Sequence, residues 1–338
     1  MRRLLSVALL VALAAGPAEA ARKRKAAPAP PLDMVSVNEA APPARLGPSL
    51  SPLAVRTAVL LDRARFSPGV VDGRGGENLT KAVKAFQAAE GLPESGTLDE
   101  ATWAKLSANS AEPALIEYAI TPEDVKGPFL EKLPAKMEEM QGLKALGYTS
   151  PREMLAERHH MSEALLTTLN RGKDLGQAGT TIIVANVAPA GPGAAGSELK
   201  GKATRIEVDK RARTLAALDA AGKVLAFYPA SVGSREKPAP SGAHQVQTVA
   251  ENPTYTYNPD YAFKGVKAAR KFDIAGGPNN PVGAVWIDLS VESYGIHGTP
   301  EPEKVGRAHS HGCVRLTNWD AQELAQMVKK GTVVEFKD

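Results

Sequence analysis

The 338-residue sequence contains a single cysteine, Cys313, within the hexapeptide SHGCVR at positions 310–315. A lone buried cysteine is ordinarily a packing residue, but the histidine, glycine and arginine around this one are polar or expose the backbone. Positive side chains and backbone N–H groups lower the pKa of a thiol and so favour the nucleophilic thiolate. Upstream, the tetrapeptide IHGT supplies His297. A lone cysteine with a distant histidine is a candidate nucleophile and base.

The same spacing also admits a zinc site, because His309, His311 and Cys313 alternate and would share one face of an extended segment. With His297 they would offer nitrogen and sulfur ligands, which suit zinc. Against this alternative, the sequence has no HExxH motif, in which a glutamate serves as the base of a zinc peptidase. We therefore favour the thiol site and expect neither a metal nor a cofactor.

The order IHGT, a short acidic spacer and then SHGCVRL resembles the catalytic motif of the L,D-transpeptidase (YkuD-type) family of cell-wall enzymes. The similarity extends from about Thr204 to the C-terminus and includes a helix that runs to Gly331. The resemblance implies that Cys313 is the nucleophile, that His297 is the general base, and that the backbone carbonyl of Gly298 orients the histidine ring. A base needs such a partner because a hydrogen bond to one ring nitrogen fixes the tautomer.

Four neighbouring residues are expected to support this site. Backbone N–H groups near Gly312 and Cys313 would form an oxyanion hole, and a glycine there keeps a side chain out of the approach. Arg315 either fixes the loop or holds a substrate carboxylate; the alternative is a structural ion pair. Ser310 and His311 are expected to shape the loop or to support the catalytic pair.

The resemblance also implies a reaction. A peptidoglycan stem tetrapeptide would donate its acyl group to Cys313, the terminal D-Ala would leave, and an amine would attack the resulting thioester. The amine acceptor is another stem, which gives a 3→3 cross-link, or a lysine of a wall-anchored lipoprotein. With water as acceptor the protein would be an L,D-carboxypeptidase, and a non-catalytic wall-binding protein is a further alternative. A carbapenem, as an acyl donor, is the expected covalent inhibitor.

The N-terminus has the features of a signal peptide at residues 1–20. A basic start is followed by the apolar run Leu4–Ala15 and by the small-residue pattern Ala18-Glu19-Ala20, so we expect cleavage after Ala20. The run is short for a membrane span. We therefore expect an exported protein in the periplasm or at the cell wall, with a role in wall synthesis or remodelling and in cell shape. An exported chain with one cysteine forms no internal disulfide, which supports use of the thiol.

The length predicts two or three domains. Residues 21–52 are an Ala/Pro-rich linker predicted to be disordered. Residues 53–107 have helical spacing and resemble a peptidoglycan-binding domain through motifs such as VDG and AVKAFQ. Residues 144–187 resemble a LysM module, a small βααβ glycan-binding unit. Residues 188–203 are a Gly/Ala/Pro linker, and residues 204–338 are the catalytic domain.

Alternating apolar residues from position 204 onward predict a mainly β domain, a sandwich or barrel-like fold with one helix over 320–330. Thr317 or Asn318 would cap this helix, and Gly331 would end it. The segment 253–259 is expected to be a loop, and the pair His159-His160 is expected at the surface. The net charge of +4 and the pI near 9.0 are only mildly basic and do not indicate a nucleic-acid partner.

Overall fold

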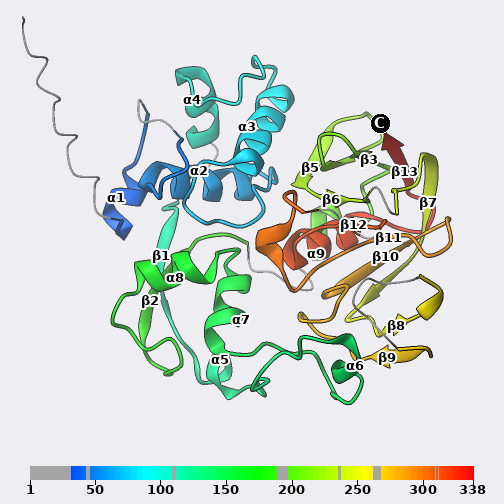
Figure 1. Ribbon diagram of the computed structural model, residues 1–338. Coiled ribbons are helices and arrows are strands. Elements are labelled where there is room, and N and C mark those ends of the chain that lie inside the picture. Colours follow the sequence, from blue (N-terminus) through cyan, green and yellow to red (C-terminus); the bar gives the residue numbers. More distant parts are fainter. Residues whose placement is uncertain are drawn as a thin grey trace, which may run out of the picture.

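The computed structural model describes residues 32–42, 46–108, 112–188, 197–234, 237–261, 268–308, 310 and 312–338. Figure 1 shows two parts that lie side by side, one built from the blue, cyan and green N-terminal elements and the other from the green, yellow and red C-terminal strands. The predicted signal peptide, residues 21–31 and 43–45 of the first predicted linker and residues 189–196 of the second lie outside the described residues. Among the helices that the structure describes, none is long and apolar enough to cross a membrane.

The first part begins with the helices α1 (Met34–Asn38), α2 (Pro52–Arg63), α3 (Glu77–Ala89) and α4 (Glu100–Ala108). The last three agree with the helical spacing predicted for residues 53–107. α1 lies within residues 21–52, which were predicted to be a disordered linker, and this prediction was wrong for α1 because its Val37 is buried in the hydrophobic core. Ser51 caps α2 by accepting a hydrogen bond from the Ala54 amide, and Pro52 occupies the first turn, where its missing N–H has no cost. Gly91 follows α3 with a φ of 67°, a conformation that favours glycine. The caps and breakers visible in the sequence therefore set these helix ends.

The segment after α4 forms a two-stranded sheet with helices between its strands. Its elements are β1 (Leu115–Ala119), α5 (Pro122–Lys126), α6 (Met137–Met140), α7 (Pro151–Arg158), α8 (Glu163–Leu169) and β2 (Thr181–Ala185). β1 pairs antiparallel with β2, from Leu115 opposite Ala185 to Ala119 opposite Thr181. The strand partner of β2 thus lies outside the predicted module at 144–187, and the LysM-like assignment stays a prediction. One hydrophobic core joins these elements to the helices α1–α4.

The second part is a curled nine-stranded sheet with the order β5-β4-β3-β13-β7-β10-β11-β12-β6. Its strands are β3 (Arg205–Asp209), β4 (Thr214–Leu218), β5 (Val224–Pro229), β6 (Ser231–Val232), β7 (Gly242–Glu251), β10 (Val285–Leu289), β11 (Gly295–His297), β12 (Val314–Arg315) and β13 (Val333–Lys337). Three short 3-10 turns occur at Ser197–Leu199, Pro259–Tyr261 and Pro302–Lys304.

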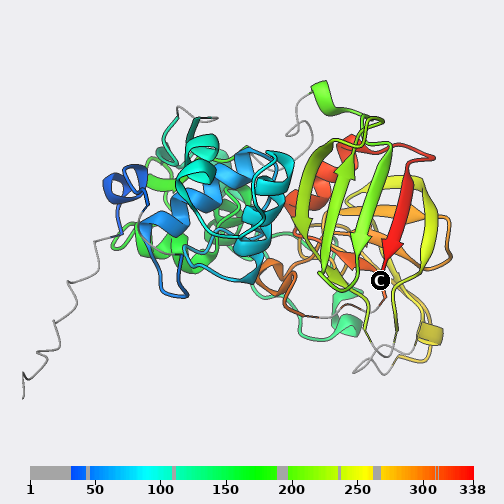
Figure 2. The ribbon, with the colours of Figure 1, turned by 90° about the horizontal axis from the view of Figure 1, so that it is seen from above.

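The two edge strands of this sheet, β5 and β6, are separated in the chain only by Ala230. The sheet must therefore curl until its edges approach each other. The long strand β7 allows this, because its first half pairs with β13 and its second half with β10. Figure 2 shows the strands wrapped around the space that their shared core fills. The prediction of a mainly β, sandwich or barrel-like domain with one helix is confirmed.

Helix α9 (Asn318–Met327) packs against β10 and β11 and contributes Leu324 and Met327 to that core. Thr317 is its N-cap and accepts from the Asp320 amide, as one of the two predicted caps. The helix ends at Met327, so the prediction of a helix to Lys330 was wrong. Val328 is already extended, with a ψ of 163°, which turns the chain toward β13 before Gly331 is reached.

The segment predicted as a loop at 253–259 contains a strand, β8 (Tyr255–Tyr257), which pairs with β9 (Phe272–Ile274). Tyr257 and Phe272 stack at 4.8 Å and form a small core with Met140 and Leu146 of the first part. The loop prediction was wrong because the proline-flanked aromatic pair gains burial by pairing with a distant strand, which no local signal reveals.

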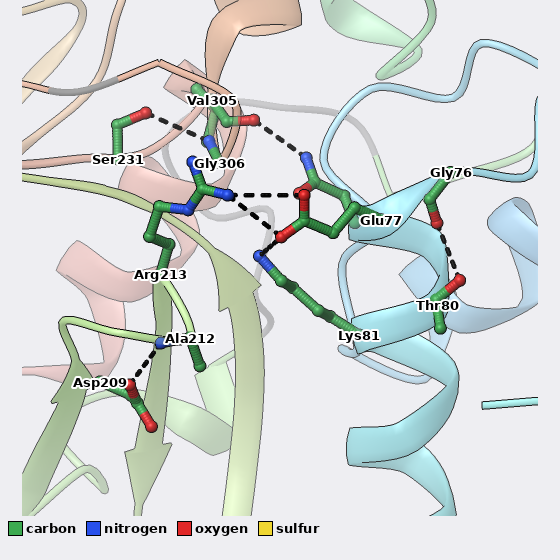
Figure 3. Close-up of polar contacts among 11 residues, drawn as sticks. Gly76, Glu77, Thr80, Lys81, Asp209, Ala212, Arg213, Ser231, Val305 and Gly306 are labelled. Atoms are coloured by element: carbon green, nitrogen blue, oxygen red, sulfur yellow. Dashed lines mark hydrogen bonds and ion pairs between the residues drawn. The ribbon is translucent and has the colours of Figure 1, made fainter. Parts of the chain in front are cut away.

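The two parts meet over an extensive polar and apolar contact. The edge of β5 that has no partner strand in the sheet is covered by the first part. There the Ser67 amide donates to the Phe227 carbonyl at 2.9 Å, and the Phe227 amide donates to the Arg65 carbonyl at 2.8 Å. Covering an edge strand in this way prevents it from pairing with other chains. Figure 3 shows the neighbouring contacts, where Arg213 of the second part lies against Glu77 at the start of α3 at 3.2 Å. The two parts are thus in direct contact through backbone hydrogen bonds and an ion pair.

The prediction that His159 and His160 lie at the surface was wrong. Both are more than nine-tenths buried. His159 Nδ1 lies 3.1 Å from the Ala185 carbonyl. His160 Nδ1 lies 2.9 Å from a carboxylate oxygen of Asp62, and its ring stacks on Trp319 at 5.0 Å. His160 thus joins α2, the α7–α8 turn and α9, so its burial depends on the contact between the two parts, whereas the hydrogen bond of His159 is made within the first part.

Candidate active site

The two sequence motifs meet on adjacent strands. β11 and β12 are parallel, with Ile296 opposite Val314 and His297 opposite Arg315. Ile296 and Val314 are buried in the core of the second part. Because side chains alternate along a strand, His297, Arg315 and Cys313 share the opposite face. Residues far apart in the sequence therefore come together by strand pairing.

His297 is held by its own loop. Only 5% of the residue is exposed, and its Nδ1 lies 2.6 Å from the Gly298 carbonyl oxygen. A carbonyl oxygen only accepts, so Nδ1 carries the proton and Nε2 of the neutral ring is free to take one. Trp286 stacks on the ring at 5.6 Å and restricts its rotation. The residue expected to orient the histidine is thus in hydrogen-bond contact with it.

The electrostatics of His297 favour a neutral ring. Burial and the positive charge of Arg315 together lower its pKa to about 3, against the opposing effect of the Gly298 and Val282 carbonyls. The imidazole is consequently unprotonated at neutral pH. A neutral imidazole is the state that a general base requires.

Cys313 is half-buried, and its Sγ lies 3.8 Å from the Ser293 carbonyl. Burial raises the pKa of the thiol, while a backbone hydrogen bond from Gly295 and the charges of Lys237 and Arg315 act in the opposite direction. The expectation from sequence was a lowered thiol pKa, and the structure differs because desolvation of the anion outweighs the nearby positive charge. The resting pair is therefore a neutral thiol beside a neutral imidazole.

The backbone around Cys313 is fixed by two contacts to its carbonyl oxygen. Ser310 Oγ donates to this carbonyl, and the Gly233 amide approaches it at 3.5 Å. Ser310 is itself buried, and its amide donates to the Gly233 carbonyl at 3.1 Å. Ser310 thus has the position that a loop-shaping residue requires. His311, the other expected supporting residue, lies outside the described residues, as does His309 of the zinc alternative.

Gly312 occupies a position that only glycine fits. Its φ is 101°, and a Cβ there would lie 2.9 Å from the Tyr294 ring and 3.1 Å from the Lys237 side chain. Lys237 in turn lies 5.4 Å from the centre of the Tyr294 ring. The sequence analysis did not identify Lys237 or Tyr294. The only signal was that Tyr294 directly precedes the strand that ends at His297.

Arg315 is the register partner of His297 in β12. Burial lowers the pKa of its guanidinium, and the negative charge of Glu301 opposes this. Its Nε has no hydrogen-bond partner among the described residues. The three roles considered for Arg315 therefore stay open.

No group of three or more His, Cys, Asp or Glu side chains within the described ranges is arranged to hold a metal ion.

Asn318 is a further residue of the site that the sequence analysis considered only as a helix cap. Its Oδ1 accepts from the amides of Ala284 and Thr299, each at 3.0 Å. A Cβ on Gly298 would lie 2.2 Å from this oxygen, and one on Gly283 would lie 2.1 Å from it. The glycine after His297 is thus required for close approach of Asn318. The motif of the catalytic loop alone could not reveal this partner.

Comparison with known proteins assigns the two parts separately. The family model described as "L,D-transpeptidase catalytic domain" matches residues 203–336, and the one described as "Putative peptidoglycan binding domain" matches residues 59–106. "Putative L,D-transpeptidase YqjB" of Bacillus subtilis is 37% identical over 138 residues, which are 39% of this chain and 69% of that protein. The chain belongs to the L,D-transpeptidase family.

Two further L,D-transpeptidases match parts of this chain. "Putative L,D-transpeptidase YkuD" of B. subtilis is 51% identical over 57 residues, 17% of this chain and 35% of that protein. The crystal structure of L,D-transpeptidase 3 from Mycobacterium tuberculosis with a faropenem-derived adduct is 18% identical and has a TM-score of 0.34. It covers 40% of this chain and 60% of the other. The predicted resemblance to this family and to a peptidoglycan-binding domain is confirmed.

A separate cleft lies where the two parts of this L,D-transpeptidase family member meet. It has a volume of about 240 Å³. Its polar lining comes from the first part and from the segment between the IHGT and SHGC motifs, and comprises Asp72, Arg74, Asn78, Ser162, Thr168, Glu303 and Arg307. His297 and Cys313 do not line it. The cleft is therefore distinct from the thiol site.

Proposed function

We propose that this protein transfers acyl groups from peptidoglycan stem tetrapeptides through a thioester on Cys313. The observation that carries the proposal is the placement of Cys313 and His297 on one face of two paired strands, with the histidine Nδ1 bonded to the Gly298 carbonyl. This arrangement leaves Nε2 as a base on the face that carries the thiol. Membership of the L,D-transpeptidase family supports the substrate class.

The neutral resting pair suggests how the steps follow one another. His297 Nε2 accepts the thiol proton as Cys313 Sγ attacks the carbonyl carbon of the bond before the terminal D-Ala. Negative charge develops on the carbonyl oxygen, and backbone N–H groups at Gly312 and Cys313 are proposed to stabilise it. The imidazolium then gives its proton to the leaving D-Ala amine. In the second half, the acceptor amine loses a proton to His297 and displaces the thiolate.

The acceptor distinguishes the possible outcomes. An amine of a second stem gives a 3→3 cross-link, a lysine of a wall-anchored lipoprotein gives protein attachment, and water gives L,D-carboxypeptidase activity. Incubation of the purified protein with disaccharide tetrapeptides, followed by mass spectrometry, tests the proposal. We expect D-Ala release, with dimers if the acceptor is a stem and tripeptides if it is water. Absence of all three products would contradict acyl transfer.

We propose that the first part of the chain holds the enzyme on the wall, since residues 59–106 match a peptidoglycan-binding family. The main core of the second part is formed by its own residues, although Phe227 packs in the core of the first part and Tyr257 and Phe272 pack with Met140 and Leu146. This main core supports folding of a fragment comprising residues 200–338. We expect this fragment to sediment with purified sacculi less than the full chain does. Equal sedimentation of the two would show that the first part is a spacer and not a wall anchor.

We propose export with cleavage after Ala20, on the basis of the signal-peptide pattern alone. N-terminal sequencing of the protein from the periplasm or the wall fraction is expected to begin at Ala21. Recovery of a chain that begins at Met1 would contradict this proposal.

A further inference from the structure

A chain of hydrogen bonds links the catalytic histidine to a carboxylate of the first part. The Gly298–Thr299 peptide is held on both sides, because its carbonyl accepts from His297 Nδ1 at 2.6 Å and its N–H donates to Asn318 Oδ1 at 3.0 Å. On its other side Asn318 Nδ2 donates to both carboxylate oxygens of Glu157, each at 3.1 Å. Glu157 belongs to α7, outside the catalytic-domain match.

The orientation of the Asn318 amide follows from its surroundings. Its oxygen faces two backbone N–H groups, of Ala284 and Thr299, which can only donate. Its nitrogen faces the Glu157 carboxylate and the Pro278 carbonyl at 3.0 Å, which offer acceptors. If the amide were flipped, its NH₂ group would face the two backbone N–H donors, and its oxygen would face the carboxylate and carbonyl acceptors. The direction of the chain from Glu157 to His297 is therefore fixed.

We propose that Glu157 is a positioning residue for His297, acting through the Asn318 amide and the Gly298–Thr299 peptide. The inference rests on the proposed acyl transfer. A negative carboxylate polarises the Asn318 amide, which makes Oδ1 a better acceptor for the Thr299 amide, and the polarised peptide makes the Gly298 carbonyl a better acceptor for His297 Nδ1. Hydrogen bonds in a chain strengthen one another in this way.

In this arrangement Glu157 has the role of the aspartate in a Ser-His-Asp triad, but it acts through intervening groups and not by direct contact with the histidine ring. In such triads the carboxylate fixes the tautomer and stabilises the imidazolium that forms during the reaction. Here the group in direct contact with the ring is a neutral carbonyl, and the charge lies two amides away. Burial disfavours the charged form of Glu157 and raises its pKa to about 7, against the effect of the Asn318 and Tyr148 hydrogen bonds. All three hydrogen bonds to Glu157 are donated to it, which suits the carboxylate form.

The chain offers a matched control for Glu157. Glu153 lies one turn earlier on the same helix and also accepts from an asparagine of the second part, since Asn279 Nδ2 donates to its Oε1 at 2.7 Å. Its other oxygen is bonded to Thr149. The side-chain hydrogen bonds of Asn279 go to Gly147 and Glu153 and its backbone amide donates to Leu146, so none of these bonds reaches the His297 loop. The two glutamates therefore share a structural role, and only Glu157 connects to His297.

The first measurement is on the full-length resting protein and needs no substrate. With ¹⁵N-labelled histidine, the Nδ1 proton of His297 is assigned by its loss in His297→Ala, among the six histidines of the chain. A strong hydrogen bond to the Gly298 carbonyl gives a downfield resonance. We expect Glu157→Gln to move this resonance upfield and Glu153→Gln to leave it in place. The same resonance in both variants and the wild type would overturn the proposal.

The second measurement is the rate at which a carbapenem acylates Cys313, followed by mass spectrometry. We expect acylation of Glu157→Gln to be about tenfold slower, the scale of a charge-assisted hydrogen bond weakened by transmission through two amides. Glu153→Gln is expected to stay within about twofold, although both variants lower the melting temperature. Equal slowing in the two would show a purely structural role.

Where Glu157→Gln does not fold, Tyr148→Phe replaces it, since it removes only the Tyr148 donor to Glu157 and should move the resonance less in the same direction.

These measurements separate the inference from the proposed function. If wild type is not acylated, acyl transfer fails, while the Nδ1 resonance still reports whether Glu157 acts on His297. If wild type is acylated and Glu157→Gln behaves like wild type in both measurements, the function stands and the positioning role of Glu157 is wrong.

Discussion

Replacement of Cys313 by alanine is expected to abolish D-Ala release and dimer formation from tetrapeptide substrates, to the limit of detection. The thiol is the only sulfur nucleophile in the chain. Its Sγ contacts the backbone of Gly295 and lies 3.8 Å from the Ser293 carbonyl, and neither contact links distant elements of the fold, so its removal should leave the fold intact. The loss of activity would then report chemistry and not unfolding. Melting temperature, compared with wild type, provides the control.

A serine at the same position is the sharper variant. Cys313→Ser keeps the shape of the side chain, but a hydroxyl is a much weaker acid than a thiol and His297 barely activates it. We expect neither variant to gain mass from a carbapenem, whereas wild type gains one adduct. A chelator should leave the wild type unaffected. Full turnover by Cys313→Ala, or activity lost to chelation and restored by zinc, would show that the thiol mechanism is wrong.

The assignment of His297 and Cys313 as a catalytic pair stays a prediction, and it could be made from the sequence because the candidate residues lie in short contiguous motifs. His297 with Gly298, and Gly312 with Cys313, are adjacent in the chain, so local spacing already constrains their geometry. The hydrogen bond from His297 Nδ1 to Gly298 is of this kind, since it joins neighbouring residues. Helix caps such as Ser51 and Thr317 were predictable for the same reason.

The thiol pKa could not be obtained from the motif. Whether the pKa of the thiol is raised or lowered depends on how completely the surrounding fold excludes water from it. Here burial outweighs the charges of Lys237 and Arg315 and raises the pKa. The motif names the charged neighbours but gives no measure of burial, so it favoured a thiolate where the structure favours a thiol. The same limitation applies to His159 and His160, whose charge-capable rings suggested a surface position.

Long-range partners formed the other class of features that the sequence did not reveal. Asn318 lies 161 positions from Glu157 and 19 from Thr299, and nothing in the residue types of these three predicts that they meet. The domain boundaries also concealed the contact, because residues 144–187 were expected to be a separate module. Pairing of β1 with β2 and the shared core place α7 against the catalytic domain instead.

Replacement of His297 by alanine is expected to slow D-Ala release by roughly 10²–10⁴-fold, the usual contribution of a positioned general base. The neutral thiol of Cys313 needs a proton acceptor at the moment of attack, and the variant lacks the imidazole of His297. Added imidazole is expected to restore part of the rate, because the deletion leaves a space beside Trp286 that a free ring fits. Activity of the variant near that of wild type would show that another group takes the proton.

The pH dependence of wild type tests the same assignment. Because the pKa of His297 is lowered to about 3, the ring stays unprotonated as the pH falls from about 8 to about 5, and its protonation removes no activity in that range. An ordinary histidine would be protonated through a midpoint near its usual pKa of 6.5. Glu157, whose pKa is raised to about 7, gains a proton in the same range and is expected to cause an acid limb near neutrality. An acid limb that persists in Glu157→Gln would show that another group causes it, and a midpoint near the usual histidine pKa of 6.5 would count against a buried, neutral His297.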